Sequence, residues 1–216
     1  MELFVLDGPF CDDGSEFNLY LGEWTDVGDA PKCSVCGKFY GALPSVPPIR
    51  GKLVAEKSMY DLSRAPGSEI LLSERCLRAF EANGIRGLID PNPIELLGVE
   101  GPIPLESLGR FFLARLRWGA EVDRVKSGLR TTEKEACSSC GLAGLIEAYD
   151  RVAIIEDSWN GHDLFTIKGL SGVVLVTDRV RKLCDDLKLT VCSLVPAGDS
   201  RIDFTMPPSI SYSKSK

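Results

Sequence analysis

Two pairs of cysteines are the residues of this chain best suited to chemistry. They lie in the frames Cys33-Ser34-Val35-Cys36-Gly37 and Cys137-Ser138-Ser139-Cys140-Gly141. Two intervening residues let both sulfurs of a pair reach one ion, and the following glycine allows the positive φ of a tight turn. Each pair supplies only two ligands, whereas a structural zinc ion takes four. We therefore expect one structural Zn²⁺ per chain, bound by Cys33, Cys36, Cys137 and Cys140.

Other interpretations of the two pairs stay open. They are a redox dithiol pair and two turns without a metal. Catalytic zinc is disfavoured, because it usually has three protein ligands, often histidine, and His162 is the only histidine. The remaining cysteines are isolated, and we expect them to be buried as small apolar residues; they are Cys11, Cys76, Cys184 and Cys192.

The sequence contains none of the common catalytic motifs. It has no GxGxxG after a strand, no GxxxxGK[ST], no HExxH and no GxSxG. His162 lies in Trp159-Asn160-Gly161-His162-Asp163, where Asn160-Gly161 predicts a tight turn. We therefore expect no catalytic residues, no enzymatic activity and no small-molecule substrate.

An internal repeat indicates how the cysteines are positioned. The two cysteine frames are offset by 104 residues, and the same offset aligns Ile70–Arg75 with Val174–Arg179. The first copy predicts a strand at 70–72, a helix from Glu74 to Asn83 capped by Ser73, and a strand at 87–89 that Pro91 and Pro93 end. The second copy predicts a Thr177-capped helix to about Leu187 and a strand at 191–195 ended by Pro196.

These elements predict a mixed α+β fold made of two pseudo-repeats. Each repeat would hold a CxxCG turn followed by strand, helix and strand, and the shared zinc site would join the two. The predicted boundaries are 1–103 for the first repeat with its N-terminal leader, 104–130 for a connecting helical segment, 131–205 for the second repeat and 206–216 for a disordered tail. We expect one compact unit.

The negative charge is concentrated at the N-terminus. The formal net charge is -6, and the first 31 residues hold eight acids and no Lys or Arg. An acidic leader suits a partner with a basic surface, so Asp12, Asp13 and Glu16 are candidate partner-binding residues, although such a leader can also serve solubility alone. Overall acidity disfavours a strongly basic nucleic-acid binder. No apolar run approaches the ~18 residues of a membrane span, and no basic signal segment follows Met1, so we expect a cytoplasmic protein that does not contact a membrane.

The two CxxCG frames, about a hundred residues apart and each followed by a strand and a Ser/Thr-capped helix, resemble the bacterial double-CXXCG motif family. Trp159, Gly161, Asp163 and Phe165 are similar to that family's W-x-G-x-D-x-F stretch. This sequence has serine after the first cysteine of each pair, where the family often has proline. The resemblance implies an immunity protein of a contact-dependent swarm-inhibition toxin system, which binds and neutralises one cognate protein toxin in the cytoplasm. It assigns no catalytic residues.

Two other functions stay open from the residues alone. A zinc-ribbon-like nucleic-acid-binding or regulatory protein would use the basic stretch between Arg110 and Arg130, where aromatic residues are interleaved. A thiol–disulfide enzyme would use the CxxC pairs and would need a thiol of lowered pKa.

Overall fold

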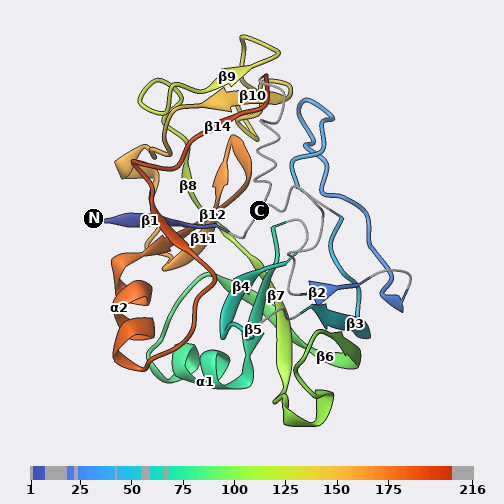
Figure 1. The fold of residues 1–216 in the computed structure, drawn as a ribbon. Helices are drawn as coiled ribbons and strands as arrows, with labels where there is room; N and C mark the ends of the chain where they lie inside the picture. Colours follow the sequence, from blue (N-terminus) through green and yellow to red (C-terminus); the bar gives the residue numbers. More distant parts are fainter. Residues whose placement is uncertain are drawn as a thin grey trace, which may run out of the picture.

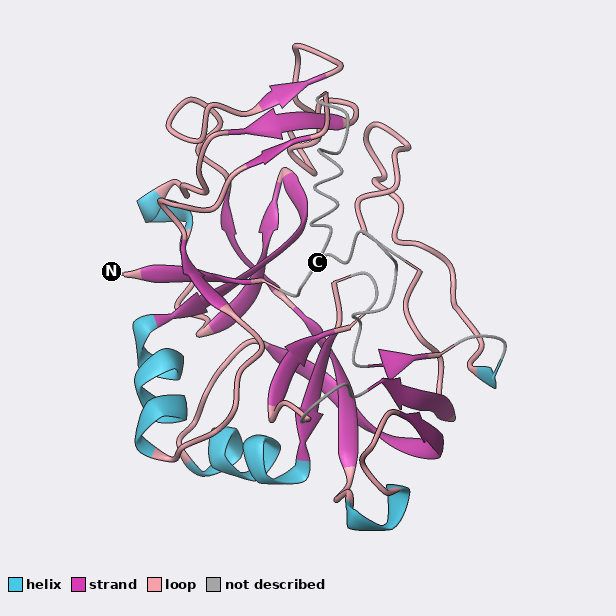
Figure 2. Cartoon of the chain, viewed as in Figure 1, coloured by secondary structure: helices cyan, strands magenta, loops and turns pink. Residues whose placement is uncertain are grey.

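The computed structural model describes residues 2–7, 19–21, 24–41, 43–54, 59–65 and 68–205. Within these ranges the chain is a mixed α+β protein with two α-helices and three sheets, as expected (Figures 1 and 2). The helices are α1 (Glu74–Ala82) and α2 (Asp178–Asp186), with the 3-10 turns η2 (Leu105–Ser107) and η3 (Glu156–Ser158). No helix of the described part is long and apolar enough to cross a membrane.

Two large sheets carry the core. The first has the strand order β13-β1-β12-β11-β8, and the second has the order β2-β3-β6-β7-β5-β4. The strands of the first are β1 (Leu3–Leu6), β8 (Trp118–Glu121), β11 (Leu164–Lys168), β12 (Leu170–Thr177) and β13 (Leu194–Pro196). Those of the second are β2 (Leu19–Tyr20), β3 (Ile49–Val54), β4 (Leu62–Arg64), β5 (Ile70–Ser73), β6 (Leu88–Glu100) and β7 (Phe111–Leu116). A small third sheet joins β14 (Ile202–Asp203), β10 (Ile146–Tyr149) and β9 (Arg130–Thr131).

The main core lies where both helices meet both large sheets. Phe80 of α1 and Val180 of α2 are fully buried in one cluster with strand residues such as Leu72 and Leu164. The predicted cap of α1 is confirmed, because the Ser73 hydroxyl accepts the Cys76 N–H at 3.1 Å. Each short helix is therefore held by the apolar face that it buries.

The expected helical segment at 104–130 is wrong. Most of its apolar residues lie in strands β7 and β8, and Phe111, Leu113 and Leu116 are buried whereas Arg115 is exposed. β7 pairs with β5 on one side and with β6 on the other, so its buried residues meet neighbours on the sheet. The aromatic and aliphatic spacing is compatible with either structure, and these long-range pairings decide for the strand.

The predicted end of the strand at Pro91 and Pro93 is also wrong, because β6 continues to Glu100. The prolines lie where the pairing of β6 with β7 shifts register, between Ile89 and Asn92. Asp90 has a φ of 43° at this irregularity. A proline lacks the N–H of a regular ladder but is tolerated at a bulge, so the strand passes through.

Two aspartates, one before each helix, each accept a hydrogen bond from the loop that follows the other helix. The Asp61 carboxylate accepts the Thr190 N–H at 2.9 Å, and the Asp163 carboxylate accepts the Arg86 N–H at 2.9 Å. Asp61 also accepts the Ser73 hydroxyl at 2.6 Å, while the Thr177 hydroxyl lies 3.4 Å from Asp163. Thr177 is the N-cap residue of α2, as predicted, although its side chain makes no hydrogen bond to a helix N–H.

Two arginines also connect the helices, which lie on the same side of the molecule (Figure 1). Arg75 of α1 donates at 2.6 Å to the carbonyls of Leu187 and Lys188, just after α2. Arg179 of α2 donates to the carbonyls of Asn83 and Gly84, just after α1. Each helix thus supplies a cation to the carbonyl end of the other, where the helix dipole favours positive charge.

Removal of the Asp163 carboxylate is expected to destabilise the fold. Its side chain is only 7% exposed, and it also pairs with Arg179 at 3.0 Å. Asp163→Ala leaves the Arg86 N–H of a partly buried hydrogen bond without its acceptor and removes the partner of Arg179, which costs about 2 kcal/mol of unfolding free energy. Urea unfolding measures this, with Asp157→Ala as the control because Asp157 is exposed and forms no ion pair among the described residues. Equal stability of the two variants would contradict this role.

Candidate metal centre

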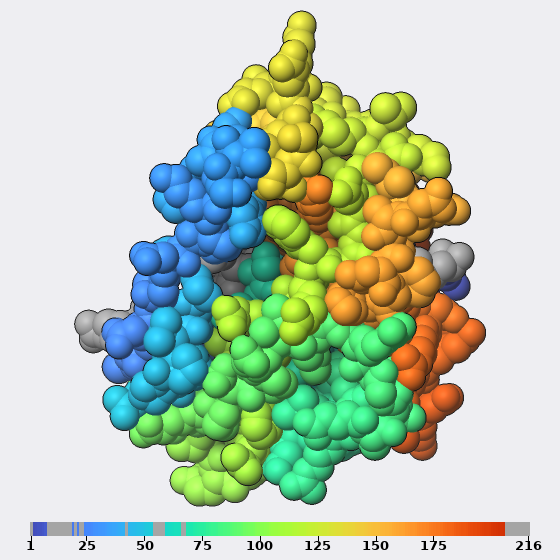
Figure 3. Space-filling model, turned by 180° about the vertical axis from the view of Figure 1, so that it is seen from behind, coloured from blue at the N-terminus to red at the C-terminus, as the bar shows by residue number. Residues whose placement is uncertain are grey.

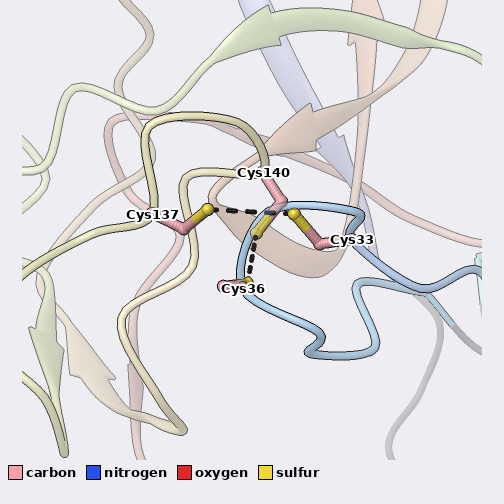
Figure 4. A group of neighbouring side chains, drawn as sticks. All are labelled: Cys33, Cys36, Cys137 and Cys140. Atoms are coloured by element: carbon pink, nitrogen blue, oxygen red, sulfur yellow. Dashed lines mark hydrogen bonds between the residues drawn. The ribbon is translucent and has the colours of Figure 1, made fainter.

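The four predicted cysteines converge into one cluster. Cys33 Sγ lies 3.8 Å from Cys137 Sγ, and Cys36 Sγ lies 3.7 Å from Cys140 Sγ (Figure 4). All four sulfur atoms lie within 4.8 Å of one another, and no disulfide joins the described cysteines. Two segments about a hundred residues apart therefore meet at their CxxC turns, and the cluster can hold a metal ion.

The spacing of the sulfurs fits a tetrahedral ion. Four sulfurs at about 2.3 Å from a central zinc lie about 3.8 Å apart, which the Cys33–Cys137 and Cys36–Cys140 separations match. A disulfide would need a sulfur separation of about 2.05 Å. The donor set is four thiols, which favours a soft or borderline ion over magnesium or calcium.

The two cysteine turns have the same backbone geometry. Gly37 and Gly141 have φ values of 72° and 75°, as the sequence predicts for the residue after each pair. Their N–H groups donate to the carbonyls of Cys33 and Cys137 at 2.9 and 2.8 Å. A side chain at Gly141 would also approach Gly169 Cα at 3.0 Å. Glycine is thus required at position 141 both by its positive φ and by the close approach of the turn between β11 and β12.

The thiols of the cluster differ in acidity. Backbone N–H groups of Cys36 and Val35 lower the pKa of Cys33 to about 6, and N–H groups of Cys140 and Ser139 lower the pKa of Cys137. Burial raises the pKa of Cys140 to about 12. A dication removes this conflict, because it stabilises all four thiolates at once.

Apolar and charged contacts reinforce the meeting of the two turns. Cys33, Cys140 and Leu142 are buried together, and Tyr40 packs against them. The Lys38 ammonium pairs with Glu133 across the two segments, and Glu133 raises the pKa of Lys38. The sequence did not predict Tyr40, Leu142 or Glu133 as part of the centre, since their contacts arise only when the two turns meet.

The other described cysteines lie outside the centre. Cys76 and Cys184 are buried in the main core, as predicted, and burial raises the pKa of both thiols. Cys192 is partly buried, and its thiol donates to the Asp7 carbonyl at 3.2 Å. Cys11 lies outside the described residues, as do Asp12, Asp13, Glu16 and the predicted tail at 206–216.

His162 lies in a bend, and its neighbours have structural contacts. The Trp159 Nε1–H donates to the His162 carbonyl at 3.0 Å, and Gly161 has a φ of 85°. Phe165 is fully buried beneath Gly119, where any side chain would overlap its ring. These contacts account for the spacing of Trp159, Gly161, Asp163 and Phe165 in physical terms.

No protein-family model matches the chain, and no curated protein is similar to it. The resemblance to the double-CXXCG motif family therefore stays a prediction.

Loss of one cysteine of the centre is expected to release the metal. Cys140→Ser removes a buried ligand, so the variant should lose its ion and melt about 10 °C lower, because binding energy at such a site is folding energy. Elemental analysis of protein purified without added metal, together with a thermal melt, checks this; one ion per chain is expected before substitution.

The matched control is Cys192→Ser, which keeps a donor for the Asp7 carbonyl and leaves the four ligands in place. It should retain the metal. A fully folded native protein without metal would refute the assignment.

Proposed function

We propose that this protein is an immunity protein that neutralises a cognate bacterial toxin by direct stoichiometric binding, with one structural Zn²⁺ per chain. The observation that carries the proposal is the convergence of two distant CxxCG turns into one four-sulfur cluster. That convergence gives the double-CXXCG resemblance a physical meaning, because the two motifs complete one site. We propose the cytoplasm as its location, since reducing conditions keep such thiols available for metal.

Zinc is the ion that best suits four thiol ligands at these distances. It accepts a tetrahedral all-sulfur shell and has no redox chemistry of its own. With four protein ligands no coordination position remains for a substrate, so the ion would act as a clasp between segments. Cys33, Cys36, Cys137 and Cys140 would hold it as thiolates.

We infer that the chain contains two copies of one structural plan. Several contacts support this, because they recur at offsets of 102 to 104 residues with the partners exchanged between halves. Asp61 holds the loop at Thr190 while Asp163 holds the loop at Arg86, and the two helix arginines exchange carbonyl partners in the same way. The cluster itself pairs Cys33 with Cys137 at this offset.

The nucleic-acid-binding alternative gains no support from the basic stretch. Its cations are largely engaged within the chain: Arg115 pairs with Asp90, Lys126 with Asp123, and Arg130 with Asp150. Charges neutralised in this way contribute little to phosphate binding. We therefore propose protein binding as the function.

Co-expression with candidate toxin domains from genes next to the one that encodes this chain tests the proposal. We expect the protein to rescue growth and to form a 1:1 complex with the toxin on size-exclusion chromatography. Cys140→Ser should weaken the rescue through loss of fold, whereas Cys192→Ser should rescue fully. A toxin that still kills cells containing the folded, metal-loaded protein would refute this function.

The acidic leader provides a separate prediction on association kinetics. Combined Asp12→Asn, Asp13→Asn and Glu16→Gln substitutions should slow association with a basic toxin surface several-fold and reduce its dependence on salt. Stopped-flow mixing at two ionic strengths measures both effects. Unchanged kinetics in both conditions would leave the leader with a role in solubility alone.

A further inference from the structure

A cleft of about 670 Å³ lies beside the metal centre. One wall comes from the cysteine-bearing loop, including Tyr40 and Leu43, and the other comes from the sheet segment Arg115–Trp118 and from β11. Seen from behind, the molecule is hollowed between the blue loop and the yellow-green strands (Figure 3). This volume is within the range of pockets that enclose small organic ligands.

Two aromatic side chains face each other at this cleft. The rings of Tyr40 and Trp118 have centroids 4.7 Å apart and are tilted by 48°. Trp118 is 38% exposed, although it is among the largest apolar side chains of the protein. Aromatic faces left accessible in a cleft are suited to packing against a planar ring.

Positive charge without a counter-ion lies next to the aromatic pair. Arg117 lines the cleft, and its guanidinium has no ion pair or hydrogen bond among the described residues. Its backbone is fixed, because the N–H donates to the Gly87 carbonyl at 3.0 Å and the carbonyl accepts the Thr166 N–H at 2.9 Å. Arg86 lies close by, since a side chain at Gly161 would meet its Nη2 at 2.9 Å.

His162 adds a neutral donor to the same region. Its Nδ1 is buried without a hydrogen-bond partner among the described residues, and His162 lines the cleft. Burial lowers the pKa of His162, and Arg117 and Arg86 lower it further. The two arginines near His162 make this a place where an anion would be stabilised.

The acidic side chains that line the cleft form no ion pair with Arg117 among the described residues. Glu69 is buried, and its two oxygens accept the Ser45 N–H at 3.2 Å and the Ser45 hydroxyl at 2.7 Å. Asp29 belongs to the loop wall, opposite the sheet segment that carries Arg117. Arg115 already pairs with Asp90 at 3.3 Å, which leaves Arg117 as the available cation.

We propose that this cleft binds a small organic anion with a planar ring, of the size of a nucleoside monophosphate. The anionic group lies beside Arg117 and His162, and the ring packs on Tyr40 and Trp118. The cleft is a binding site, and no reaction is assigned to it. The proposal is independent of toxin binding and would stand if growth rescue failed.

Isothermal titration calorimetry of the protein as purified tests the proposal, with the four nucleoside 5′-monophosphates, the matching nucleosides and inorganic phosphate as probes. At least one monophosphate should bind 1:1 and at least tenfold more tightly than its nucleoside and than phosphate, because only the monophosphate reaches both the cation and the rings. Failure of all four to bind, or equal affinity for a monophosphate and for inorganic phosphate, overturns the proposal.

Variants distinguish binding in the cleft from attraction by surface charge in general. Arg117→Gln and Trp118→Leu should each weaken monophosphate binding at least tenfold while each variant stays folded and keeps its metal. Arg78→Gln is the matched control, because Arg78 is an exposed arginine of α1 that does not line this cleft. Equal weakening by Arg117→Gln and Arg78→Gln would show non-specific attraction and overturn the assignment.

Discussion

The requirement that four thiols share one small volume is the constraint on which much of this structure depends. Bare thiolates at 3.7 to 3.8 Å would repel one another, and burial together with the neighbouring cysteines raises the pKa of Cys140. A bound dication would turn this repulsion into attraction and would fix two turns that the sequence separates by about a hundred residues. The long loop before β3 has few backbone pairings of its own, so its position against the second cysteine turn rests on this centre and on the small apolar cluster around Leu142.

The helices are joined by a different kind of interaction. They share one apolar core, and several polar groups near their ends form hydrogen bonds across the interface. Asp61 and Asp163 accept N–H groups from opposite loops, and Arg75 and Arg179 cover opposite carbonyl ends. Either helix without the other would leave these groups unpaired and its own apolar face open to water, so the two helices depend on each other.

The sequence predicted the features that local chemistry determines. The ligand set, the positive φ after each cysteine pair, the mixed α+β class and the Ser73 cap all follow from residue type and short spacing. Strands β7 and β8 and the passage of β6 through Pro91 and Pro93 depend on pairings with distant strands, which no local pattern encodes. The cleft was not predicted for the same reason: Tyr40, Trp118 and His162 come from three separate segments and have no common motif.

The metal centre and the cleft are mechanically connected through Tyr40. Its N–H donates to the Pro31 carbonyl at 3.1 Å, its ring packs on the cysteine cluster, and the same ring meets Trp118. The loop wall of the cleft is therefore held by the cluster, while the opposite wall belongs to the sheets and has its own support. A change at the four sulfurs would move one wall and leave the other in place, so an ion that takes no part in chemistry would still set the width of the site.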